Sequence, residues 1–111
     1  MTYRTLITAV PALQKLVSQN APIRVAYRLS KIVRRVNEEL DFFKTRKAEL
    51  EASHEYAVPP DEYDRLLDFE IDWEEPRVEI PLDANLELSC ADVDALEPFI
   101  SLKEDESNAE N

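Results

Sequence analysis

Acidic side chains alternate with apolar ones in the second half of the chain, at Glu70, Asp72 and Glu74. This alternation is typical of a half-buried strand whose outer face is acidic. Such a ridge would complement a basic protein surface, and complementary charge mainly speeds and steers association. The alternative is an ordinary solvated face, because strand alternation produces such rows routinely. We predict that this row contacts a protein partner, for which a basic surface would be the natural complement.

A basic row lies in the first half of the chain, in a segment with helical periodicity. Its members are spaced by three and four residues, which places them in one line on a helix; they are Arg24, Arg28, Lys31 and Arg35. The row could contact nucleic-acid phosphates, capture an anionic nucleotide at an oligomer interface, or dock the acidic half of the chain. We favour docking or simple solvation. The acidity of the whole chain and the lack of interleaved aromatic residues argue against a nucleic-acid partner.

The remaining candidates for chemistry are the single histidine, His54, and the single cysteine, Cys90. One histidine near Glu51 and Glu55 makes a poor metal site, and at a helix end it is typical of a favourable C-terminal charge. Cys90 has no basic neighbour in the sequence, so we expect a small, unreactive core residue. The chain contains no glycine, which excludes glycine-rich phosphate loops and nucleophile elbows. We predict a non-enzymatic protein without metal or cofactor.

Length and charge indicate one domain built from two unlike halves. The chain has 111 residues and a net charge of −11, which is room for a single core. Residues 1–50 carry ten basic and four acidic side chains, whereas residues 51–111 carry three and twenty. We expect a domain over 1–102, with a basic helical half (1–54), an acidic α/β half (55–102) and a disordered acidic tail (103–111). The halves could neutralise each other, or the asymmetry could mark an interaction surface.

The most regular segment runs from residue 22 to about residue 54 and predicts one amphipathic helix of about thirty residues. Its apolar residues recur at alternating spacings of three and four, as in a coiled-coil seam; they include Leu29, Val33, Val36, Leu40, Phe43 and Leu50. We expect this seam to be too long for one subunit to cover, which predicts self-association. The alternative is that the acidic half folds back along the whole stripe.

The other elements predict a mainly helical α+β fold. Residues 3–7 are rich in β-branched and aromatic types and predict a short strand. Residues 8–19 predict a short helix with Pro11 in its first turn, where a missing N–H is tolerated. Later short segments predict a helix over 61–67, a hairpin joining strands at 69–74 and 78–82, and a helix over 90–97. Ser89 followed by Asp92 resembles a capping box opening that last helix, with an extended segment after it.

The long apolar runs and N-terminal leader of membrane and exported proteins are not found in the sequence, and a single cysteine fits a reducing compartment. We therefore expect a cytoplasmic protein without a membrane partner.

Three stretches carry a resemblance: residues 6–16, residues 22–29 with the long helix, and Leu88-Ser89 with residues 92–100. Together their layout resembles a family of small proteins of tailed bacteriophages and prophages. The resemblance implies a phage gene acting in the cytoplasm of a bacterial host, and it implies no activity. Family members often carry a longer, glycine-bearing insert after the long helix, where this chain has only residues 53–60.

These observations lead to one principal functional hypothesis and two alternatives. The principal one is an oligomeric, phage-encoded protein-binding module whose acidic half inhibits a host or phage protein, as an anti-defence factor or an antitoxin-like factor would. One alternative is a phage assembly or scaffolding factor, suggested by the long helix. The other is an oligomer that sequesters an anionic nucleotide through the basic row.

Overall fold

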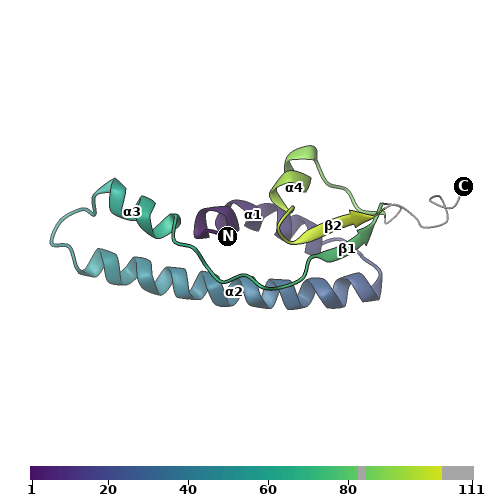
Figure 1. Ribbon diagram of the computed structural model, residues 1–111, viewed down its shortest axis with the longest axis horizontal. Helices are drawn as coiled ribbons and strands as arrows, with labels where there is room; N and C mark the ends of the chain where they lie inside the picture. The colour runs from purple at the N-terminus through teal and green to yellow at the C-terminus, as the bar shows by residue number, and fades with distance from the viewer. Residues whose placement is uncertain (83–84, 104–111) are drawn as a thin grey trace, which may run out of the picture.

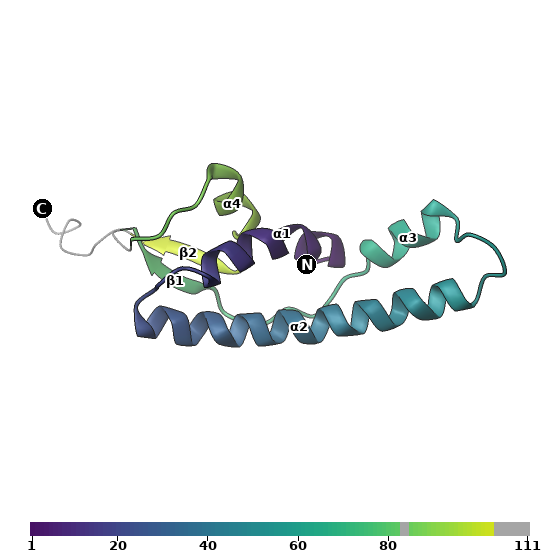
Figure 2. The same ribbon diagram turned by 180° about the vertical axis from the view of Figure 1, so that it is seen from behind.

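The computed structural model describes residues 1–82 and 85–103, and it has a mainly helical α+β fold. Its elements in chain order are α1 (Tyr3–Val17), α2 (Ile23–Ala52), α3 (Pro60–Leu67), β1 (Val78–Pro81), α4 (Cys90–Ala95) and β2 (Ile100–Lys103). Helix α2 forms a long base, and the other elements lie along one side of it (Figure 1). Seen from behind, α1 lies in front of the two strands over the first half of α2, while α3 covers its far end (Figure 2).

Helix α2 confirms the predicted long helix almost to the residue. Its buried stripe consists of residues at spacings of three and four, Val25, Leu29, Ile32 and Val36. The helix ends at Ser53, whose N–H donates to the carbonyl of Glu49 at 3.0 Å. Many helices are followed by a residue with left-handed backbone angles, but Ser53 has right-handed ones.

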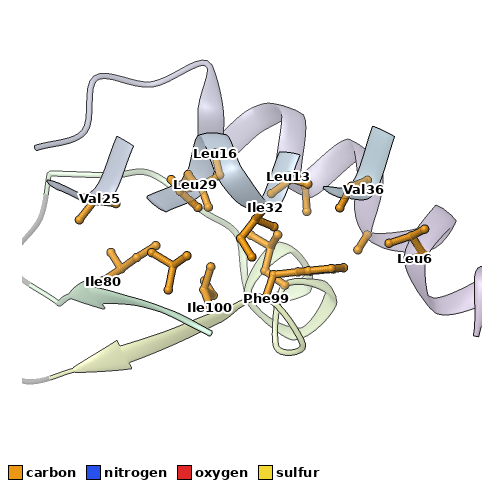
Figure 3. Packing of buried hydrophobic residues seen from close by; sticks show 14 of the residues in the cluster. Leu6, Leu13, Leu16, Val25, Leu29, Ile32, Val36, Ile80, Phe99 and Ile100 are labelled. Atoms are coloured by element: carbon orange, nitrogen blue, oxygen red, sulfur yellow. The ribbon is translucent and has the colours of Figure 1, made fainter. Parts of the chain in front are cut away.

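One hydrophobic cluster joins the two halves of the chain. Leu6, Leu13 and Leu16 of α1 pack toward the buried stripe of α2, and residues of the acidic half close the cluster from the third side. Figure 3 shows Ile80, Phe99 and Ile100 pointing into the same space as the α1 and α2 side chains. Burial of these residues is the main stabilising contribution to the fold, at roughly 1.5–3 kcal/mol for each large side chain.

The predicted strand at residues 3–7 is wrong, because these residues form the first turns of α1. Thr2 caps the helix: its side-chain oxygen accepts a hydrogen bond from the N–H of Thr5 at 3.2 Å. The helix therefore starts five residues earlier than expected, and Pro11 lies in its interior instead of in its first turn. The buried residues on either side of Pro11, Leu6 and Leu13 among them, hold the helix together across the missing N–H.

The predicted hairpin is also wrong. Strand β1 pairs with β2 in parallel, with Val78 opposite Ile100 and Ile80 opposite Leu102, and α4 lies in the connection. Tight hairpin turns need residues with positive φ, and none occurs among the described residues of this glycine-free chain. The segment expected to be the first strand instead follows the N-terminus of the chain: Ile71 N–H donates to the Met1 carbonyl at 2.8 Å, and Glu70 forms an isolated bridge with Thr2.

The short helices of the acidic half follow the sequence pattern closely. Helix α3 folds back onto the end of α2, where the Tyr63 hydroxyl donates to the Glu51 carboxylate at 3.2 Å. The capping box of α4 is confirmed in both directions between Ser89 and Asp92. Lys103 belongs to β2, so the predicted tail does not begin there; the rest of that prediction, 104–111, lies outside the described residues.

Ion pairs connect the basic half to the acidic half. Arg4 of α1 contacts Asp64 at 3.2 Å and Asp68 at 2.9 Å, and Lys15 contacts Asp92 at 2.9 Å. These pairs support the interpretation that the halves partly neutralise each other within one fold. All of them are at least partly exposed, so each contributes little to stability on its own.

The Lys15–Asp92 pair predicts a specific loss of stability in acid. The Lys15 ammonium, followed by the Ser89 backbone N–H, lowers the pKa of Asp92 from its ordinary value of 3.8. A carboxyl group with a lowered folded-state pKa contributes stability that is complete above its unfolded pKa and is lost as the pH falls through the folded one. In urea denaturation at stepwise lower pH, the free energy of unfolding of the wild type should exceed that of Asp92→Asn at neutral pH, and this difference should disappear below about pH 4.

Asp94→Asn is the matched control, since Asp94 is exposed on the same helix and makes no ion pair within 1–82 and 85–103. An advantage of the wild type over Asp92→Asn that stays constant from neutral pH to acid would contradict the assignment.

Candidate functional site

The acidic row predicted from the sequence lies on an extended segment that contacts the N-terminus of the chain and α2. We call residues 69–77 the acidic segment. Ile71 is buried and Trp73 is half-buried, whereas the side chains of Asp72 and Glu74 are exposed. The alternation of inward and outward side chains is therefore confirmed for these four residues, although only Glu70 takes part in a bridge. Phe69, expected to face inward, is 56% exposed.

Arg35 and Trp73 fasten the acidic segment to α2. The indole ring of Trp73 meets the ring of Phe99 edge-on, with 5.2 Å between centroids. The Arg35 guanidinium lies 5.7 Å from the centre of the indole ring, and its Nη2 donates to the Asp72 carbonyl oxygen at 3.1 Å. Arg35 also pairs with Glu39, one turn further along α2. The backbone of the segment is thus fixed while its carboxylates point away from the core.

The three carboxylates of the predicted row have different surroundings. The side chain of Glu70 is 74% exposed, yet its carboxylate lies 3.0 Å from the amino group of Met1. Asp72 and Glu74, together with the adjacent Glu75, make no ion pair with any residue in the described part of the chain. The carboxylates available to a partner are therefore those of Asp72, Glu74 and Glu75, and Glu75 is the residue that the alternation rule missed.

The basic row is divided between internal and external roles. Arg35 is half-buried and holds the acidic segment, as the docking interpretation predicted. Arg24, Arg28 and Lys31 are exposed, and Lys31 lies 4.6 Å from the centre of the Tyr27 ring. Arg28 also affects the acidic half: after the larger effect of Lys103, it helps to hold the pKa of Glu79 below its usual range.

A pocket of about 570 Å³ lies between the basic row and the start of β1. Its lining combines charged groups from α2 and from the strand with apolar side chains; they are Arg28, Lys31, Ile32, Glu75, Pro76, Arg77, Val78 and Glu79. Of its charged residues, only Arg28 and Lys31 were candidates from the sequence. Arg77 and Glu79 enter the pocket because β1 pairs with β2 and packs on α2, and no local pattern predicts that placement.

The six residues proposed as an oligomer seam lie on the core side of α2. Leu29 and Val36 are 2% and 3% exposed, and the other four, Val33, Leu40, Phe43 and Leu50, are half-buried. Elements of the same chain cover this side, since α1, α3 and β1 all pack on α2. The argument that one subunit cannot cover the stripe therefore loses its basis, and self-association stays a prediction. The most exposed apolar side chain of α2 is instead Ile23, at 85%.

His54 and Cys90 occupy different kinds of position. The Nε2 atom of His54 lies 2.6 Å from the Glu62 carboxylate, and its Nδ1 atom lies 2.9 Å from the Leu50 carbonyl oxygen. His54 thus links the end of α2 to α3. Cys90 was expected in the core, and this is wrong: it is exposed at the start of α4. The capping box places Ser89 and Asp92 against the backbone and leaves the first helical side chain in solvent.

Tyr3 is the buried polar side chain that the sequence did not single out. Its hydroxyl donates to the Glu39 carboxylate at 3.3 Å, and burial, followed by the charge of Glu39, raises the pKa of Tyr3 to about 12. Because Glu39 also pairs with Arg35, the start of α1 is connected to the anchor of the acidic segment.

No group of three or more His, Cys, Asp or Glu side chains in 1–82 and 85–103 is placed to hold a metal ion. None of the helices in the same ranges combines the length and the hydropathy that crossing a membrane requires.

Comparison of the chain with protein-family models, with curated proteins and with solved structures found no match.

Proposed function

We propose that this chain is a non-enzymatic, phage-encoded protein-binding module that inhibits a host or phage protein through its acidic half. The single observation that carries the proposal is that the carboxylates of Asp72 and Glu74 are exposed and unpaired among the described residues. The side chains of Ile71 and Trp73, by contrast, pack in the core. A partner would meet a charged ridge whose backbone is already ordered.

The backbone that carries Asp72 and Glu74 is ordered before any partner binds. Arg35 fixes the Asp72 backbone through its carbonyl oxygen, so the carboxylate of the same residue remains available. A surface that is ordered before binding loses less conformational entropy in the complex. Complementary charge on a basic partner would raise the association rate most strongly at low salt. Host-directed inhibition of the anti-defence or antitoxin-like kind is the use that fits the phage resemblance.

Charge reversal tests the proposal. We expect the double variant Asp72→Lys, Glu74→Lys to lose the bacterial protein that the wild-type chain captures from a lysate of phage-infected cells. The captured protein should carry a basic surface, and its retention should fall with rising salt. The matched control is Glu38→Lys, Asp41→Lys, which reverses two exposed carboxylates of α2 that make no ion pair within the described ranges.

Circular dichroism on both variants checks that the fold is kept. Equal capture by the two double variants would show that the acidic segment is not the contact surface. Co-purification with capsid or tail proteins, unaffected by either change, would favour the alternative of a phage assembly factor.

A further inference from the structure

The pocket beside the basic row has the composition of a ligand site. It lies where the chain running toward β1 passes the first half of α2, an arrangement visible in Figure 1. Its volume of about 570 Å³ falls within the range of small-molecule sites, about 300–1,000 Å³. The two walls come from residues far apart in the sequence, α2 on one side and residues 75–79 on the other.

The charged groups of the pocket leave positive charge available. Arg28 and Lys31 make no ion pair with any side chain in 1–82 or 85–103. They are three residues apart on one helix, so their side chains reach toward the same point. Of the two carboxylates in the lining, Glu79 is held by Lys103 at 2.7 Å. Arg77 is paired with Glu97 at 4.0 Å, so Arg28 and Lys31 are the cations available to an anion.

The apolar part of the lining forms a floor between the charged walls. Ile32 and Val78 belong to the buried cluster and are held in place by it, and Pro76 stands beside them. Ile32 and Val78 are each only 3% exposed, so Pro76, which is exposed, provides the apolar surface on which a flat aromatic ring would pack. The pocket therefore offers two kinds of contact at once, cationic groups for an anion and an apolar surface for a ring.

We propose that this pocket binds a nucleoside monophosphate within a single subunit. Arg28 and Lys31 bind the phosphate, because charge-assisted bonds to phosphate are the strongest contacts available there. The base packs on the exposed ring of Pro76. Glu75, which has no ion pair in the described ranges, accepts a hydrogen bond from an amino group of the base or from a ribose hydroxyl. A polynucleotide is disfavoured, because the chain as a whole carries a net charge of −11.

Isothermal titration calorimetry on the full-length wild-type chain tests the proposal with four probes: AMP, inorganic phosphate, adenosine and an oligonucleotide. AMP should bind measurably, inorganic phosphate more weakly, and adenosine least, since it lacks the anion. Binding of AMP should weaken as salt is raised. A short single-stranded oligonucleotide is the fourth probe, and tighter binding of this probe than of AMP would overturn the proposal in favour of a polynucleotide. No heat from AMP at millimolar concentration would overturn it entirely.

Two double variants locate the site. Arg28→Gln, Lys31→Gln should weaken AMP binding by about tenfold or more, because each change removes a charge-assisted hydrogen bond. Arg34→Gln, Lys44→Gln removes the same charge from exposed positions of α2 that do not line the pocket, and it should leave AMP binding within about twofold of wild type. Equal weakening in both variants would show a general effect of charge and contradict the site.

The pocket shares Glu75 with the carboxylates available to a protein partner, but Asp72 and Glu74, whose charges the test above reverses, do not line it. Either proposal can therefore fail while the other stands.

Discussion

Replacing Phe99 with alanine should lower the free energy of unfolding by about 3–5 kcal/mol, the usual result of emptying a buried aromatic site. Phe99 is fully buried and packs edge-on against Trp73, and its carbonyl oxygen accepts the Val78 N–H at 2.9 Å. It thus sits where the acidic segment, β1 and the end of α4 meet the helices. The free energy of unfolding of a native protein is about 5–15 kcal/mol, so this one change would remove a large share of the stability.

Urea denaturation followed by circular dichroism measures this effect as a lower midpoint with an unchanged slope. Phe42→Ala is the control, because the same side chain at position 42 is 47% exposed and rests against Arg46. It should lose less than about 1 kcal/mol. Similar losses in the two variants would mean that the acidic half is not packed on the helices as described.

Placing aspartate at Val36 should unfold the chain instead of dissociating an assembly. Val36 is 3% exposed and belongs to the cluster shared by α1, α2 and the acidic half. An unpaired charge at such a site costs about 3–5 kcal/mol. If the seam of α2 were mainly an interface between subunits, the same substitution would instead yield a folded monomer.

Circular dichroism combined with sedimentation over a range of concentrations separates the two outcomes. Asn37→Asp is the control, as it introduces the same group at the next residue, where the side chain is exposed. It should keep the helical signal and the sedimentation behaviour of the wild type. A folded, smaller species from Val36→Asp would restore the oligomer seam as the explanation for the stripe.

Helical periodicity and capping signals were reliable guides along this chain. The thirty residues of α2 were predicted because their apolar spacing is regular over many turns, and such a pattern is compatible with one conformation only. The Ser89–Asp92 capping box was predicted because both of its hydrogen bonds are made between residues three positions apart. The inward and outward positions around Ile71 and Trp73 also followed from local alternation.

Local signals misled wherever two patterns competed for the same residues. Residues 3–7 contain strand-forming types, but the Thr2 cap and the burial of Tyr3 and Leu6 against the core favour a helix there. The alternation of 69–74 resembled a hairpin strand, although without glycine a tight turn to β1 was unfavourable. The candidate site changed accordingly. The Glu70 carboxylate pairs with the N-terminal amino group, and the exposed carboxylate of Glu75 is available beside those of Asp72 and Glu74.

The sequence by itself determined the length of α2, the capping box of α4, the acidic and basic rows, and which side of α2 is apolar. These properties depend on residues a few positions apart. The tertiary structure alone decided that β1 pairs with β2, that the acidic half covers the stripe of α2, and that Arg77 and Glu79 face Arg28 across a pocket. Those contacts join residues separated by twenty or more positions, and their choice depends on the total burial of apolar surface, which no short stretch of sequence contains.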